Sequence, residues 1–176
     1  MGDLWLIRFS APSRFYVDNI EATRVTFRDG WVRTGDVARI DRDGFVHLVD
    51  RSDDIVSCGG QTFGTFEIED CLASHPLVFA AAVVGVPTPL LGERVVAAVV
   101  LPPGFVDRAA ARRELLAHCR EILPAPSVPT RFVFLPELPV APSGKVQKRA
   151  IRAMAADGDA GVVAREHEDR SRNAEL

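Results

Sequence analysis

Paired cysteines, a membrane-spanning stretch and a signal peptide would each assign a protein to a class, and this sequence of 176 residues lacks all three. Cysteine is scarce: only Cys58, Cys71 and Cys119 occur, and no two of them form a Cys-x-x-Cys pair. This excludes a disulfide framework and a zinc finger, and favours a reduced, cytoplasmic protein without a metal site of its own. No stretch reaches the roughly 18 apolar residues of a membrane span. The start, Met1 to Trp5, lacks the basic segment of a signal peptide.

A large excess of charge of either sign is also missing. The sequence has 21 Lys and Arg against 24 Asp and Glu, for a formal net charge of -3. Binding to nucleic acid or to an anionic membrane needs a basic surface, so we expect neither partner. What is present is an ordinary globular composition, with 47% hydrophobic and 26% charged residues. The length suits one domain plus a piece of another.

Hydrophobic patterning predicts a small α+β domain over residues 53–156. The expected order is β-α-β-β-α-β-α, with strands over 55–58, 78–86, 94–101 and 131–135 and helices beginning near Thr65, Asp107 and Val146. Two of these helices have an apolar face, formed by Ile68, Cys71 and Leu72 in the first and by Leu115, Cys119 and Ile122 in the second. We therefore expect a small three-stranded sheet with packed helices.

The two flanking segments differ from this domain. Residues 1–52 predict short strands over 4–9, 37–40 and 45–49, a helix over 19–23 and a hairpin turn at 41–44. Few long apolar runs accompany these strands, so we expect the β-rich tail end of a larger N-terminal domain. Residues 157–176 are rich in Gly, Asp, Glu and Arg without any period, which predicts a disordered tail.

Lys145 ends the run Pro142-Ser143-Gly144-Lys145. The prolines Pro139 and Pro142 restrict the approach, and Ser143-Gly144 supplies a turn in which the glycine can take positive φ. Such a stiff loop can deliver the lysine to another part of the molecule as a point charge with three donors. Taken alone, the run favours an ordinary solvated turn lysine.

Three further runs carry candidate functional groups. Asp36 follows a turn at residues 29–30, and its carboxylate can accept two hydrogen bonds from a vicinal diol such as a ribose, or be only a turn acid. The charged segment 50–54 indicates either an interdomain hinge or a solvated linker. Gly59-Gly60, before a helix, allows a ligand to approach the backbone closely or simply ends a strand.

Together and in this order, these runs closely resemble the C-terminal end of the adenylate-forming (AMP-binding) superfamily. That superfamily includes acyl-CoA synthetases, firefly luciferases and peptide-synthetase adenylation domains. The matching segments are 30–36 (GWVRTGD), 49–54 (VDRSDD), Gly59-Gly60 with 67–69 (EIE), 83–87 (VVGVP), Gly92-Glu93 and 142–145 (PSGK). The resemblance extends from residue 2 to about residue 155 and is strongest to the acyl-CoA synthetases.

The resemblance implies a reaction. These enzymes join a carboxylate to ATP, giving an acyl-adenylate and pyrophosphate, and a thiol, usually coenzyme A, takes the acyl group after the C-terminal domain swings. By resemblance, Lys145 is the catalytic lysine of adenylation, where it bridges developing charge on the carboxylate and the α-phosphate. The same resemblance implies that Asp53 is the hinge residue. It also implies that Asp36 and Arg51 bind the nucleotide and that Gly59-Gly60 lines the channel for coenzyme A.

Two departures from the family pattern qualify this picture. Thr62 stands where the acetyl-CoA synthetase branch has an arginine near the phosphates. The sequence also has no Gly/Ser/Thr-rich phosphate loop ending in Pro-Lys-Gly and no aromatic-Gly-x-Thr-Glu run. In the family these runs hold ATP, its Mg²⁺ and the acyl group.

We therefore expect a C-terminal fragment of an ATP-dependent acyl-CoA synthetase of fatty acid metabolism. This acid–thiol ligase would use ATP and CoA as substrates and would be inactive without its missing N-terminal adenylation domain. The alternatives are one half of a split ligase, a peptide-synthetase adenylation domain acting in trans, and a non-catalytic interaction module. The presence of Lys145, Asp36 and Asp53 argues against the last, since a surface lysine and a hinge acid have no structural need.

Overall fold

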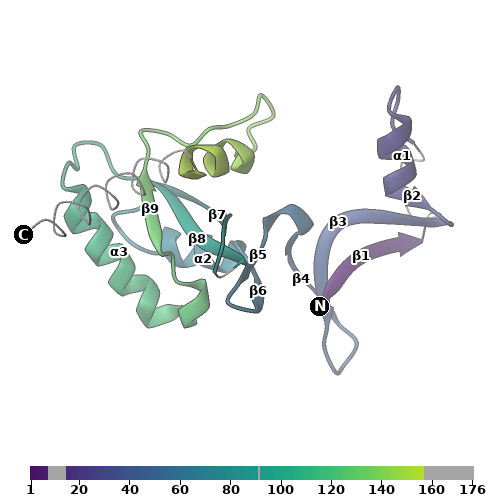
Figure 1. The fold of residues 1–176 in the computed structure, drawn as a ribbon, viewed down its shortest axis with the longest axis horizontal. Helices are drawn as coiled ribbons and strands as arrows, with labels where there is room; N and C mark the ends of the chain where they lie inside the picture. Colours follow the sequence, from purple (N-terminus) through teal and green to yellow (C-terminus); the bar gives the residue numbers. More distant parts are fainter. Residues whose placement is uncertain (8–14, 91, 157–176) are drawn as a thin grey trace, which may run out of the picture. The chain divides into compact units, whose positions relative to one another are not determined.

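A computed structural model describes residues 1–7, 15–90 and 92–156 of the chain (Figure 1). The expected disordered tail, 157–176, lies outside these residues. The chain divides into two compact units, Met1–Ile55 and Val56–Leu176, and each is described by itself. The expected domain boundary, between residues 52 and 53, falls within a short 3-10 helix (η2, Ser52–Asp54) near the end of the first unit. None of the helices in the described ranges is long and apolar enough to cross a membrane.

The first unit is an antiparallel sheet with one short helix. Its strands are β1 (Gly2–Ile7), β2 (Phe27–Arg28), β3 (Trp31–Ile40) and β4 (Val46–Arg51), and β3 pairs with each of the other three. Helix α1 (Ile20–Thr26) begins at Asn19, whose side chain accepts a hydrogen bond from the backbone N–H of Ala22. The expected hairpin joins β3 to β4. At its turn, Asp41 accepts backbone hydrogen bonds from Asp43 and Phe45.

This unit has almost no core of its own. Among its described residues, Val37 and Ala38 are the only buried hydrophobic ones. Ile40, Phe45 and Leu48, in contrast, are all about two-thirds exposed or more. A sheet needs a covered apolar face for independent stability, so this unit has the character of one edge of a larger body.

The second unit contains a mixed sheet of five strands, β6-β5-β8-β7 with β9 on β8. These are β5 (Ile55–Cys58), β6 (Gln61–Gly64), β7 (Ala80–Thr88), β8 (Gly92–Val100) and β9 (Arg131–Phe134). The α+β class is confirmed, but the sheet has more than the expected three strands. Gly59 and Gly60 have φ of +58° and +78°, and this conformation turns the chain tightly back into β6. The sequence predicted either close approach of a ligand or the end of a strand at these glycines, and it did not predict β6.

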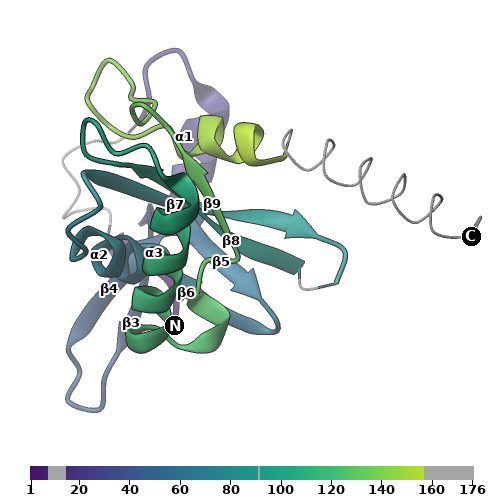
Figure 2. The ribbon, with the colours of Figure 1, turned by 90° about the vertical axis from the view of Figure 1, so that its left-hand side faces the viewer.

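Helices cover both faces of this sheet. Helices α2 (Phe66–Ala73) and α3 (Arg108–Ile122) lie side by side on one face (Figure 2), and a helix over residues 148–156 packs on the other. The central strands alternate between the two cores. Val83 belongs to the cluster under α2 and α3, and its neighbours Ala82 and Val84 pack with Ile151 of the third helix. This alternation is what the period of a strand buried on both faces requires.

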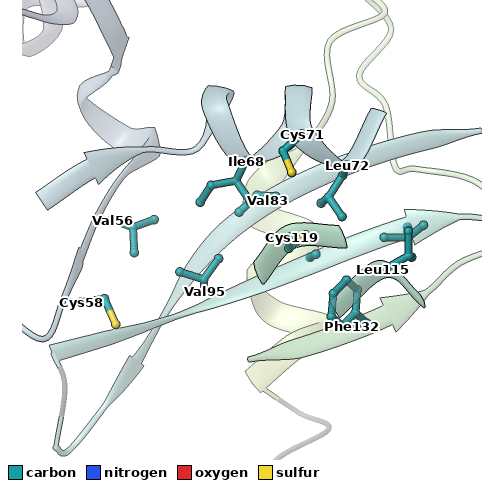
Figure 3. Packing of buried hydrophobic residues seen from close by; sticks show 12 residues of the cluster. Val56, Cys58, Ile68, Cys71, Leu72, Val83, Val95, Leu115, Cys119 and Phe132 are labelled. Carbon is teal, nitrogen blue, oxygen red and sulfur yellow. The ribbon is translucent and has the colours of Figure 1, made fainter. Parts of the chain in front are cut away.

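Figure 3 shows the larger core, where α2 and α3 meet the sheet. The predicted inward face of α2, formed by Ile68, Cys71 and Leu72, is confirmed. In α3, Leu115 and Cys119 are buried as predicted, but Ile122 is 56% exposed and the third buried position is Ala111. By helical spacing Ile122 falls on the same stripe as positions 111, 115 and 119. It is the last residue of α3, however, and its side chain at that end of the helix is left exposed.

Candidate functional site

Asp36 and Arg51 are brought into direct contact by the first sheet. They are register partners on β3 and β4, and Nη1 of Arg51 lies 3.2 Å from Oδ1 of Asp36. Gly35, with φ of +77°, lies beneath the guanidinium: a Cβ there would be 3.2 Å from Nη2 of Arg51. A carboxylate offers about four acceptor positions, so the ion pair leaves capacity on Asp36 for hydroxyl groups of a ligand.

Asp53 lies in η2, between β4 of the first sheet and β5 of the second. Arg51 before η2 and Ile55 after it both have extended backbones. The link between the two units is therefore a single short turn, with Asp53 exposed in it. Rotation about such a turn needs changes at only a few backbone dihedrals.

Gly59 and Gly60 form the exposed tip of the β5–β6 hairpin. A Cβ at either position would meet nothing within 4 Å, so packing does not require glycine there. Their positive φ values do, because side chains disfavour that conformation. The hairpin thus presents bare backbone at its tip.

Glu93 fastens this hairpin to the rest of the sheet, a contact that the sequence did not reveal. Its Oε2 accepts a hydrogen bond of 2.8 Å from the backbone N–H of Ser57. The carboxylate lies directly over Gly85, where a Cβ would be 2.7 Å from Oε1. Both residues belong to the segments that carry the family resemblance. Glu93 acts as a buttress for the hairpin, and the absence of a side chain at Gly85 leaves room for its carboxylate.

We expect Gly85→Ala to destabilise the second unit by about 1–3 kcal/mol. The new methyl group must displace the Glu93 carboxylate, which then loses its hydrogen bond to Ser57. Urea unfolding should show a lower midpoint at an unchanged slope. Gly2→Ala is the control, since a Cβ there meets nothing within 4 Å. Equal stability of the two variants would contradict the buttress.

Lys145 lies in a tight loop that is closed by hydrogen bonds between its own backbone groups. The N–H of Ala141 donates to the carbonyl of Lys145 and the N–H of Gly144 donates to the carbonyl of Ala141, both at 2.8 Å. Val140 and Val146 form a β-bridge across the loop. The Lys145 side chain is exposed, and within the described part of the chain nothing forms a hydrogen bond or ion pair with its ammonium group. A braced loop therefore presents an available positive charge.

A second lysine close to Lys145 is anchored instead. The Nζ of Lys148 donates to Oγ1 of Thr65 at 2.7 Å and lies 2.9 Å from Oε1 of Glu69. Thr65 occupies the predicted N-cap position of α2, but its side chain makes no capping hydrogen bond. The patterning had indicated only a capped helix start and a basic stretch, so it missed this cluster.

The predicted site residues fall into two sets. Asp36, Arg51 and Asp53 belong to the first unit, and Gly59-Gly60 and Lys145 belong to the second. The first set places a carboxylate–guanidinium pair just before the connecting turn. The second set places a bare-backbone hairpin and an available lysine on one small domain.

The three cysteines are all free and buried. Burial, together with the adjacent Cys71, raises the pKa of the Cys119 thiol to about 12. Burial also raises the pKa of Cys71 above its ordinary value. Because the thiolate is the reactive form, these thiols have the character of core residues.

We expect Ellman's reagent at pH 8 to leave Cys119 unmodified in the native chain. With a pKa of about 12, only about one thiol in 10⁴ is ionised at that pH. Unfolding in guanidinium should release all three thiols of the chain. Rapid native labelling at Cys119, located by peptide mapping, would contradict the buried environment.

Comparison with known proteins gives consistent matches. Residues 67–145 match the AMP-binding enzyme C-terminal domain family. A peroxisomal butyrate–CoA ligase of Arabidopsis thaliana is 38% identical over 155 residues, which cover 88% of this chain and 27% of the relative. A human mitochondrial acyl-coenzyme A synthetase is 37% identical over 140 residues, which cover 78% of this chain and 24% of the relative.

Solved structures agree with these sequence matches. The anthranilate CoA ligase in complex with anthranoyl-AMP matches with a TM-score of 0.72 at 34% identity, over 81% of this chain and 28% of that one. The chain thus spans 24–28% of the length of these three relatives.

Proposed function

Because the chain belongs to the adenylate-forming (AMP-binding) family through its C-terminal domain, we propose that it is the C-terminal part of an ATP-dependent acyl-CoA synthetase. The observation that carries the proposal is the available Lys145 on a braced loop of that domain. The names of its relatives support CoA ligation, since they include ligases for butyrate and benzoate. Its substrates would be ATP, CoA and a carboxylic acid, in fatty acid metabolism.

The proposed first step is adenylation. A carboxylate oxygen attacks the α-phosphorus of ATP, the bond to the leaving pyrophosphate breaks, and an acyl-adenylate forms. Negative charge gathers on the carboxylate and phosphate oxygens in the transition state, and the ammonium of Lys145 would stabilise it. Asp36 would accept hydrogen bonds from the ribose hydroxyls, with Arg51 fixing its carboxylate and contacting the same nucleotide.

The proposed second step is thioester formation. The thiol of CoA loses its proton to solvent, its sulfur attacks the acyl carbonyl, the bond to the phosphate oxygen breaks, and AMP leaves. Lys145 would obstruct this step, so we propose that rotation about Asp53 withdraws it. The same rotation would bring the Gly59-Gly60 tip to the pantetheine arm, where bare backbone permits close approach.

Two partners would have to come from outside the described residues. We propose that an upstream adenylation domain, in the same or a separate chain, supplies the phosphate loop and the acyl pocket. We propose further that Mg²⁺ arrives with ATP and is held by that domain. The compartment is a separate proposal: the free cysteines favour the cytoplasm, and fractionation of cells that express the protein tests it.

The test is pyrophosphate release with ATP and a panel of carboxylic acids. The isolated chain should show none, whereas addition of the polypeptide encoded directly upstream should produce acid-dependent release and, with CoA, a thioester. Robust turnover by the isolated chain would overturn the proposed division of labour. No thioester with the upstream part present would overturn the CoA ligase itself.

A further inference from the structure

Lys148, Glu69 and Thr65 form a cluster, called here the Lys148 cluster, that neither proposed reaction step uses. The Nζ of Lys148 contacts Oγ1 of Thr65 at 2.7 Å and Oε1 of Glu69 at 2.9 Å. The same Oε1 accepts the backbone N–H of Val83 at 2.8 Å. The Lys148 and Glu69 side chains are only 16% and 24% exposed, and Thr65 is fully buried.

These bonds join three separate parts of the second unit. Thr65 and Glu69 lie at the start of α2, Val83 lies in β7, and Lys148 opens the helix over residues 148–156. An ammonium group has three donors, and at least two of them are engaged here. Lys148 is thus a fixed point, unlike an ordinary surface lysine with a mobile side chain.

Lys145 lies three residues before this fixed point. A fully extended chain spans roughly 10 Å over that separation, which limits how far the Lys145 backbone can move. The other side of the loop is also tied, because Gln147 donates its backbone N–H to Pro139 and its side-chain amide to Val140. Lys145 therefore projects from a loop anchored on both sides.

We infer that the Lys148 cluster is the positioning element of Lys145. The cluster fixes the end of the loop against α2 and β7, so that the Lys145 side chain projects from the domain at one defined position. A misplacement of about 1 Å in a catalytic group can cost about 10²-fold in rate. The catalytic consequence rests on the proposed function, whereas the anchoring of the loop does not.

Hydrogen exchange on the full 176-residue chain tests the anchoring. Lys148→Met keeps the length and apolar stem of the side chain but removes its donors. Amides between residues 141 and 147 should exchange at least about tenfold faster, whereas those of β7 and β8 should stay within about twofold. Arg149→Met is the matched control, since Arg149 is the exposed neighbour of Lys148.

A double variant shows whether the ion pair acts as a unit. Glu69→Gln combined with Lys148→Met should give loop exchange no faster than Lys148→Met alone, because the pair is already broken. Unchanged exchange over 141–147 in Lys148→Met would overturn the inference. So would an equal rise in β7 and β8, which would show general destabilisation instead.

An activity measurement separates this inference from the proposed function. With the upstream polypeptide added, Lys148→Met should lower adenylation by about 10- to 100-fold and leave thioester formation from preformed acyl-adenylate within about twofold. Failure of the unaltered chain to adenylate would overturn the proposed function, and exchange would still decide the anchoring. Full adenylation by Lys148→Met beside an active unaltered chain would overturn the positioning role.

Discussion

Lys145→Ala is expected to lower acid-dependent pyrophosphate exchange by about 10²- to 10³-fold when the upstream polypeptide is present. This is the usual loss when one preorganised electrostatic contact to a transition state is removed. Thioester formation from a synthetic acyl-adenylate and CoA should change by less than about twofold, because Lys145 is proposed to be withdrawn in that step. The two half-reactions, measured separately, give this contrast directly.

Two controls show whether the loss of activity comes from the missing lysine and not from unfolding of the chain. Lys145 is exposed, so its replacement should alter the free energy of unfolding by no more than about 0.5 kcal/mol. Lys145→Arg keeps the charge but replaces a compact ammonium with a planar fork, and we expect it to recover only part of the exchange rate. An equal loss in both half-reactions would argue against a lysine that serves adenylation alone.

The second large effect is expected on stability, from Leu115→Ala in α3. Leu115 is fully buried in the cluster between α3 and the sheet, as Figure 3 shows. Removing it leaves a cavity, and such changes cost about 2–5 kcal/mol. That is a large part of the 5–15 kcal/mol of a typical domain, so urea unfolding should show a much lower midpoint.

Ile122→Ala provides the matched control on the same helix. Ile122 is 56% exposed, and its truncation should cost no more than about 0.5 kcal/mol. Equal losses at positions 115 and 122 would mean that both side chains are buried, as the sequence pattern had predicted. That result would contradict the exposure of Ile122 at the end of α3 described above.

Local sequence patterns were sufficient to predict the elements whose apolar residues recur at a regular spacing or form a long run. The long valine-rich runs predicted β7 and β8, and the spacing of Ile68, Cys71 and Leu72 predicted the buried face of α2. The β5–β6 hairpin was missed because a pair of glycines suits both a strand end and a tight turn. The choice depends on the pairing of β5 with β8, where Cys58 faces Gly92, and local sequence does not encode that pairing.

The candidate site was predicted only as separate residues. Family resemblance picked out Asp36 and Arg51, but their contact depends on the register of β3 and β4, which shifts by a bulge between Val37 and Ala38. The Lys148 cluster was harder still to predict from sequence, since Lys148 and Thr65 are 83 residues apart in the chain. Contacts over such separations are set by how the whole domain packs. The roles proposed for these residues remain predictions.

The near absence of a core in the first unit has a consequence for the protein inside a cell. Residues 56–156 bury apolar side chains on both faces of their sheet, and so have what they need to fold unaided. The first sheet leaves Ile40, Phe45 and Leu48 open to water. Exposed apolar surfaces are aggregation liabilities, and chains that are not stably folded are triaged by chaperones and proteases in cells. A chain synthesised without anything to cover that sheet would be trimmed from its N-terminal side, and supply of the covering partner would set its abundance.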